Sequence, residues 1–207
     1  MKILKETVSK LGNKIQMFGC DNHKPILVIG VFHGDEPQGE FLINEYLKFN
    51  STSQMLFIPC LNPDGMKLNQ RQNSNGVDLN RNFPTTNWQI AEDKTFYGGE
   101  KPNSEIETKF MVDVIEEYKP KLILSLHAPF CTVNFDGDAL EYAEKISEII
   151  NYPVQVDIGY PTPGSFGTYC GIERGIPTIT LELDENIDVN RLIKPVHKIS
   201  DYINSVI

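Results

Sequence analysis

Three residues of types that bind metal ions stand where predicted β-strands end. His33 and Glu36 lie three positions apart in a glycine-containing turn that follows an apolar, β-branched run. His127 follows a second run of this kind. In α/β proteins, ligands bind at the carboxyl ends of the strands, where neighbouring strands bring distant residues together. Two imidazoles and a carboxylate can hold zinc with one position open. Taken singly, each residue has an ordinary explanation: His33 and Glu36 could lie in a surface turn, and His127 could be a histidine that only makes a hydrogen bond. The metal-site hypothesis therefore depends on all three.

A long irregular segment, Asn62 to Asn103, contains the next candidates. It is rich in Asn, Gly and Pro without a convincing apolar period, and a compact domain rarely keeps so long a stretch without a function. Its opening Asn62-Pro63-Asp64-Gly65 predicts a turn in which Pro sets φ and Gly allows a positive φ. Arg71 and Arg81 follow, the second directly after Asn80. Their guanidinium groups can bind a carboxylate or a developing oxyanion, although arginines in a loop can also serve solubility alone.

Glu182 interrupts the otherwise apolar strand predicted for Pro177–Leu183. A carboxylate is not expected to be buried in such a strand unless it has a partner. At a strand end that faces a metal-bound water, it can accept the proton of that water. The alternative is a side chain that points outward from an edge strand.

The elements that must position these residues follow from the hydrophobic pattern. Apolar, β-branched runs bounded by turn residues predict strands at Ile26–Phe32, Met55–Pro59, Leu122–Leu126 and Pro177–Leu183, and weaker ones at Lys14–Phe18, Cys131–Phe135 and Val154–Asp157. Helical patterns lie at Gly39–Phe49, Ser104–Tyr118, Asp138–Ile150 and Val189–Ile207. Ser104 followed by Glu107 predicts a capping box. This alternation favours an α/β sheet covered by helices on both faces.

Composition limits the class of protein. The chain has 207 residues, 40% of them hydrophobic, and a formal net charge of −9, which disfavours a nucleic-acid partner. Four cysteines without a CxxC pair are typical of reduced thiols. Neither a signal peptide nor an apolar run of membrane-spanning length is recognised, so we expect a cytoplasmic protein without a membrane partner.

The order of the motifs resembles the zinc carboxypeptidase family, the funnelin metallopeptidases. The shared features are His-x-x-Glu at 33–36, Asn-Pro-Asp-Gly at 62–65, Gly-Val-Asp-Leu-Asn-Arg-Asn-Phe-Pro at 76–84, a distant strand-end His and a strand that carries Glu. They extend over about 150 of the 207 positions. The resemblance implies a three-layer α/β/α sandwich with a mixed, largely parallel central sheet, in a single catalytic domain over residues 1–207.

The resemblance also implies roles for individual residues. His33, Glu36 and His127 would hold one zinc ion per chain. Glu182 would act as the general base and acid, and Arg71 would polarise the scissile carbonyl.

Three further residues would contact a small peptide substrate. Asn80 and Arg81 would hold its terminal carboxylate, and Tyr160 stands where the family often places a mobile Tyr over the substrate. The run that ends in Asn-Arg-Asn-Phe-Pro and the Tyr-x-Thr-Pro-Gly-Ser segment are most similar to the murein peptide amidases. Those bacterial cytoplasmic enzymes cut the γ-D-glutamyl–diaminopimelate bond during cell-wall recycling.

Other functions remain open from the sequence alone. A zinc deacylase of the aspartoacylase or succinylglutamate desuccinylase type shares His-x-x-Glu and a DLNR-like segment. A non-catalytic metal- or peptide-binding module is a second alternative, and a carboxypeptidase with another specificity is a third. The Asn-Pro-Asp-Gly turn and the long GVDLNRNFP run favour the peptidase, and every catalytic position is filled. The oligomeric state is not predicted.

Overall fold

The computed structural model describes residues 1–23, 25–157 and 159–206. Within these ranges eight strands form one mixed sheet in the order β1-β2-β4-β3-β5-β8-β6-β7. Their bounds are β1 Lys2–Val8, β2 Lys14–Gly19, β3 Ile26–Gly30, β4 Leu56–Ile58, β5 Leu122–His127, β6 Thr132–Asp136, β7 Val154–Gln155 and β8 Thr178–Glu182. The four central strands, β4, β3, β5 and β8, run parallel, whereas β2 and β6 pair antiparallel with β4 and β8.

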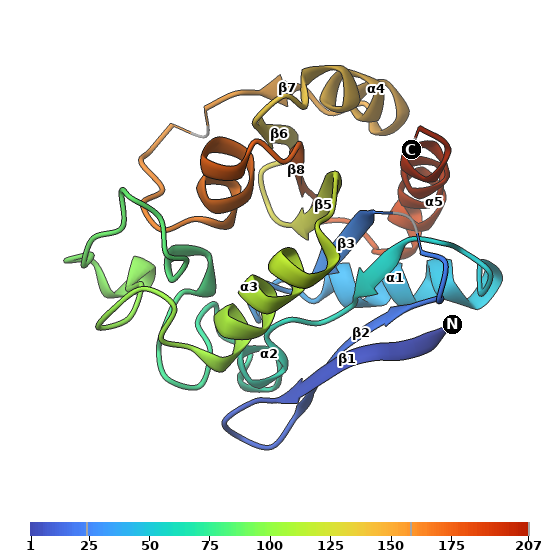
Figure 1. Cartoon of the computed structure of the whole chain (residues 1–207). Coiled ribbons are helices and arrows are strands. Elements are labelled where there is room, and N and C mark those ends of the chain that lie inside the picture. Colours follow the sequence, from blue (N-terminus) through green and yellow to red (C-terminus); the bar gives the residue numbers. More distant parts are fainter. Residues whose placement is uncertain (24, 158, 207) are drawn as a thin grey trace.

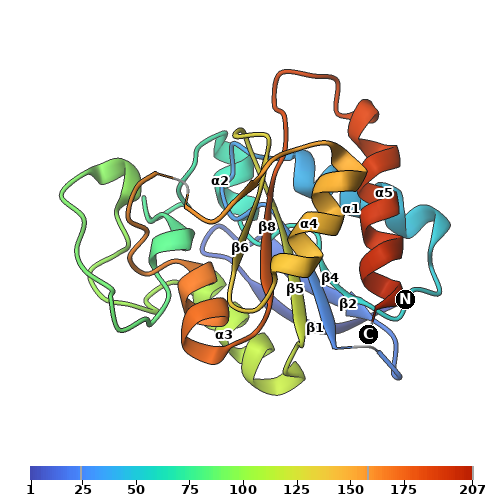
Figure 2. The ribbon, with the colours of Figure 1, turned by 90° about the horizontal axis from the view of Figure 1, so that it is seen from above.

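Helices cover both faces of this sheet, which gives the three layers expected from the sequence (Figure 2). One face packs against α1 (Gln38–Phe49), α4 (Leu140–Ile150) and α5 (Asn190–Ser205). The other face packs against α3 (Ile106–Tyr118) and a short helix, η3 (Thr168–Ile172). The β3 and β5 strands are buried along their whole length, because both of their faces are covered by apolar side chains.

The seven predicted strands and four predicted helices are all present, most with ends that differ by one or two residues. The end predicted for the last helix, Ile207, lies outside the described residues. β1 is an additional strand, an edge strand paired antiparallel with β2. The capping box at Ser104 is wrong: the N-cap of α3 is Glu105, which makes no side-chain capping bond, and the Ser104 hydroxyl instead donates to the Glu105 carboxylate.

The segment predicted to be irregular begins with a short helix, α2 (Pro63–Leu68), where a turn was expected. The Asn62 side chain accepts a hydrogen bond from the Gly65 N–H, and Pro63 occupies the first helical turn. Gly65 does not adopt a positive φ. Glycine is required because a Cβ atom would lie 2.4 Å from the Gln72 carbonyl oxygen. The rest of the segment is largely irregular apart from two short helices, η1 (Leu79–Arg81) and η2 (Lys94–Phe96), and it extends from the side of the molecule opposite α5 (Figures 1 and 2).

Two features bear on the environment of the protein. Among the described helices, none is long and apolar enough to cross a membrane. All four cysteines are free, and Cys60 and Cys170 are buried.

Candidate active site

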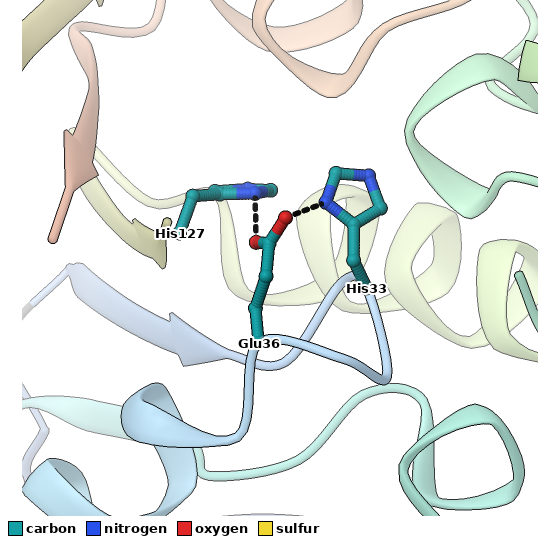
Figure 3. Close-up of side chains that lie close together, drawn as sticks. All are labelled: His33, Glu36 and His127. Carbon is teal, nitrogen blue, oxygen red and sulfur yellow. Dashed lines mark hydrogen bonds and ion pairs between the residues drawn. The ribbon is translucent and has the colours of Figure 1, made fainter. Parts of the chain in front are cut away.

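The side chains of His33, Glu36 and His127 meet at the carboxyl ends of β3 and β5 (Figure 3). The Glu36 carboxylate lies between the two imidazoles, with Oε1 2.7 Å from Nδ1 of His33 and Oε2 3.1 Å from Nδ1 of His127. One ligand atom from each residue lies within 4.8 Å of the others. All three side chains are buried. Two imidazole nitrogens and a carboxylate therefore converge on one small volume.

The backbone after β3 turns sharply to deliver His33 and Glu36. Val31 has a φ of 54°, in the left-handed region, which β-branched residues rarely adopt. The carbonyl oxygens of Gly30 and Val31 accept hydrogen bonds from the N–H groups of Leu61 and Asn62, which hold this turn against the start of α2. Because β3 and β5 are adjacent parallel strands, His127 at the end of β5 completes the cluster.

Asp78 is a site residue that the sequence analysis did not single out, although it stands inside the GVDLNRNFP run. It is fully buried, and its Oδ1 lies 3.2 Å from Nε2 of His33. Burial opposes the imidazolium, but the carboxylates of Glu36 and Asp78 outweigh it and raise the pKa of His33 to about 9. The surroundings of His33 are therefore strongly attractive to a cation.

Arg71 lies on the far side of the same aspartate. Its Nε and Nη2 donate to Oδ2 of Asp78 at 3.0 and 2.9 Å, and its Nη1 lies 3.7 Å from Oε1 of Glu36. Burial opposes its charge, but Asp78 and Glu36 outweigh burial and raise the pKa of Arg71 above its ordinary value. Asp78 thus fixes both a cluster histidine and the nearest guanidinium.

Arg81 is buried, yet among the described residues no carboxylate forms an ion pair with it. Its Nη1 donates to the backbone carbonyl of Asn80 at 2.7 Å, and Asp78 and Tyr160 lie near enough to favour its charge. Burial lowers the pKa of Arg81. The Asn80 side chain accepts a hydrogen bond from the Phe166 N–H through Oδ1, which leaves its amide hydrogens for a ligand. Together these two residues present hydrogen-bond donors and a positive charge that no described carboxylate pairs with directly.

Glu182 ends β8, a strand between β5 and β6 rather than an edge strand, and its register partner on β5 is His127. Its side chain is buried, and Oε2 has no hydrogen-bond partner among the described residues. Burial is the main cause that raises the pKa of Glu182. A buried carboxylate with one unpartnered oxygen has a raised affinity for protons and can take one up at that oxygen.

All eight residues selected from the sequence line one cleft. They are His33, Glu36, Arg71, Asn80, Arg81, His127, Tyr160 and Glu182. Tyr160 lies in the loop before η3, with the Arg81 Cζ atom 6.0 Å from its ring centroid. Asp136, the last residue of β6, also lines the cleft. Like Asp78, it is an acidic residue that the sequence analysis did not single out. Among the described residues none donates a hydrogen bond to its carboxylate, and burial raises its pKa.

The sequence of residues 13–138 matches the family model described as zinc carboxypeptidase. The chain belongs to the zinc carboxypeptidase family. Murein peptide amidase A of Escherichia coli K12 is 34% identical over 158 residues, or 70% of this chain and 65% of that protein. The murein peptide amidase A of Vibrio campbellii is 39% identical over 140 residues, or 61% of this chain and 55% of that protein.

A solved relative shares the fold. The crystal structure of murein-tripeptide amidase from Escherichia coli O157 superimposes with a TM-score of 0.83 and 29% identity, covering 95% of this chain and 89% of that one. In sequence, however, the chain spans 65% and 55% of the lengths of the two amidases named above.

The residues of the cluster are suited to hold zinc, the ion after which this family is named. Two histidines and a glutamate are a donor set that holds catalytic zinc, with a fourth position for water or substrate. Both imidazoles turn the same nitrogen, Nδ1, toward the cluster. The other nitrogen of His33 is held by Asp78, as is usual for histidines that bind metal ions. Glu182 lies beside the cluster without being part of it.

Proposed function

We propose that this chain is a zinc-dependent exopeptidase or amidase that hydrolyses the amide bond next to a residue with a free carboxylate. The supporting observation is Arg81, a buried cation that makes no ion pair among the described residues, in the cleft that contains the His33–Glu36–His127 cluster. An unpaired buried charge is costly, so such a cleft favours an anionic ligand. A substrate carboxylate on Arg81 and Asn80 would bring the adjacent amide bond toward the cluster.

The proposed metal site consists of His33, Glu36 and His127, with one ion per chain. A zinc ion there would act as a Lewis acid and lower the pKa of bound water toward about 7. Asp78 would keep His33 in place, and metal content after His127→Ala is the direct check of the ligand set.

Three other residues of the cleft have separate roles in the proposed reaction. Glu182 takes up a proton from the attacking water and delivers it to the leaving amine. Arg71, oriented by Asp78, donates to the carbonyl oxygen as negative charge develops there; a donor of this kind contributes a factor of about 10²–10³ to kcat. Tyr160 would close over the bound substrate.

For the substrate, we propose the γ-D-glutamyl–diaminopimelate bond of murein peptides. The names of the relatives support this choice, and so does Asp136. Diaminopimelate carries an ammonium group at the far end of its side chain, and Asp136 is a half-buried carboxylate without a hydrogen-bond donor among the described residues. Gly167 leaves room for this carboxylate, because a Cβ atom there would lie 2.0 Å from Oδ2 of Asp136. The cleft thus has a positive group for the carboxylate next to the cleaved bond and a negative group for the ammonium of the side chain.

We also propose that residues 1–207 act as one catalytic domain, since strands from both halves of the chain contribute site residues to one sheet. The four free cysteines agree with a cytoplasmic location.

The test is turnover by the zinc-loaded protein of L-Ala-γ-D-Glu-meso-diaminopimelate, compared with three other compounds. These are the same peptide amidated at the carboxylate next to the cleaved bond, the peptide with norleucine in place of diaminopimelate, and a set of N-acyl amino acids. We expect cleavage of the first, and at least 100-fold lower kcat/KM for the amidated and norleucine peptides. Preferred turnover of N-acyl amino acids would instead identify a deacylase.

Two variants connect these results to the structure. Arg81→Ala should lose most of the discrimination between the free and the amidated peptide, since the lost contact acts on the carboxylate. Asp136→Asn should lose the discrimination against norleucine. Unchanged discrimination in either variant contradicts the role proposed for that residue.

A further inference from the structure

Phe96, the last residue of η2, contacts both arginines of the cleft. The Cζ atoms of Arg71 and Arg81 each lie 5.5 Å from the centroid of its ring. The ring of Tyr160 lies 5.8 Å from the same centroid. One half-buried ring in the irregular segment therefore touches three residues to which the proposed function gives roles.

The ring lies beside the cleft, next to the two arginines. Arg71, Arg81 and Tyr160 line the cleft, whereas Phe96 lines the two neighbouring hollows and not the cleft itself. The guanidinium groups therefore line the cleft directly, and the ring contacts them from the neighbouring hollows.

The backbone around Phe96 is tied to the site. The Asp93 side chain accepts a hydrogen bond from the Thr95 N–H and begins η2. The Thr95 carbonyl accepts a hydrogen bond from Gln72, next to Arg71, and the Tyr97 carbonyl accepts one from the N–H of Asp78. These contacts hold the backbone that carries Phe96 near both arginines.

The charges explain what such a ring can contribute. Two guanidinium groups near one another repel, and the proximity of Arg71 contributes to the lowered pKa of Arg81 after the larger effect of burial. Asp78 bonds directly to Arg71 but not to Arg81. An aromatic face attracts a cation within about 6 Å of its centroid. Phe96 offers that attraction to both groups without a negative charge that would compete with a substrate carboxylate.

We propose that Phe96 is a positioning residue that holds the guanidinium groups of Arg71 and Arg81 in the cleft. The effect on catalysis rests on the proposed function, whereas the effect on the two side chains does not. Arg81 depends on the ring more than Arg71, because two hydrogen bonds to Asp78 also hold Arg71.

The first test is NMR of the arginine Nε–Hε groups in the whole protein. In Phe96→Leu, which keeps an apolar side chain, we expect loss of the ring-current shifts of Arg71 and Arg81 and a lower heteronuclear NOE, largest for Arg81. Phe96→Tyr, which keeps an aromatic ring, should keep both the ring-current shifts and the heteronuclear NOE at their wild-type values. Tyr97→Leu is the matched control, since it makes the same kind of change at the next position. Arg174, whose Cζ lies 3.4 Å from the centroid of the Tyr169 ring, is an internal reference that should not change.

The second test is kinetic. For the peptide substrate that the wild type cleaves, Phe96→Leu should raise KM about 5-fold, in the range expected for lost cation–π contacts. Its kcat should fall less, the amidated peptide should be less affected, and Phe96→Tyr should restore the wild-type values.

The two tests separate the possible failures. Arginine resonances that are unchanged in Phe96→Leu, or a Phe96→Tyr variant that behaves like Phe96→Leu, would overturn the proposal. A wild type that cleaves no tested peptide refutes the proposed function, while the NMR result still decides the role of the ring.

Discussion

At the scale of single residues, the site depends on a few charges whose environment sets their behaviour. Glu182 is buried beside His127 with one oxygen unpartnered, and burial raises its pKa. Glu182→Gln keeps the shape of the side chain but removes the basic oxygen. We expect an unchanged zinc content and a kcat lower by about 10²–10⁴, the usual loss for a missing general base. The measurements are metal analysis and steady-state kinetics.

The matched control is Glu144→Gln, the same change at an exposed position of α4. It should leave kcat unchanged. Turnover near the wild-type rate in zinc-loaded Glu182→Gln would rule out the proposed mechanism.

Asp78 contacts both His33 and Arg71, and the loss of its charge at His33 should weaken the metal site. Asp78→Asn removes the charge that faces Nε2 of His33 and binds Arg71. The loss of such a partner behind a metal-binding histidine weakens metal affinity by about 10–100-fold. Competition with a fluorescent zinc chelator measures this affinity, and Asp35→Asn, an exposed position in the loop of His33, is the control. Equal zinc affinities in the two variants would show that Asp78 does not support the metal site.

The metal-binding candidates could be predicted from one sequence because His and Glu at the ends of apolar runs are rare and informative. Asp78, Asp136 and Phe96 could not. Aspartate is common in loops, and only the structure shows that Asp78 is fully buried. Asp136 stands just past a weakly predicted strand, and an apolar ring such as Phe96 carries no chemical signal in the sequence.

At the scale of elements, α2 supports the loop that carries His33 and Glu36. Gly34 of this loop packs directly on the backbone of α2, where a Cβ atom would lie 2.0 Å from the carbonyl carbon of Gly65. Gly34→Ala must therefore separate the loop from the helix. We expect a free energy of unfolding lower by about 1–3 kcal/mol, together with weaker zinc binding. Urea unfolding and zinc titration check the two effects.

Asp35→Ala changes the next, exposed residue and should alter neither quantity by much. If Gly34→Ala lost stability but bound zinc as the wild type does, the contact with α2 would not position the metal-binding loop.

The helix α2 also shows what a sequence pattern leaves undecided. Asn-Pro-Asp-Gly is typical of a turn, but Pro is equally suited to the first turn of a helix. Here the Asn62 cap and the close packing against Gly34 select the helix. β1 was not predicted because most of its residues are exposed or half-buried, so that it lacks the apolar run that marks the central strands.

At the scale of the whole molecule, Asp64 joins the β1–β2 hairpin to the irregular segment. Its carboxylate accepts hydrogen bonds from Ser9, Leu11, Asn13 and Ser74. Burial opposes its charge, but these bonds outweigh it and lower its pKa below the ordinary value of 3.8. The stability that it contributes is therefore fully present above about pH 4 and is lost as the pH falls through the lower pKa of the folded state.

Asp64→Asn should accordingly lower the free energy of unfolding at pH 7, by about 2 kcal/mol for hydrogen bonds to a charged group. The difference from the wild type should shrink as the pH falls below 4, because protonation of the wild-type carboxyl removes the same charge. Denaturant unfolding over this range measures both. A difference that stays constant with pH would show that the charge of Asp64 does not stabilise the hairpin.

The unpaired charge of Arg81 links ligand binding to the stability of the whole fold. A folded state that contains this buried cation without a direct ion pair is less stable than one in which a bound carboxylate pairs with it. A ligand at 100 times its dissociation constant adds about 2.7 kcal/mol to the free energy of unfolding. For a chain of this size that raises the melting temperature by about 5–10 °C. Melting temperatures measured with each member of a library of amino acids should therefore rank these compounds by how well they fit the cleft, before any substrate is known.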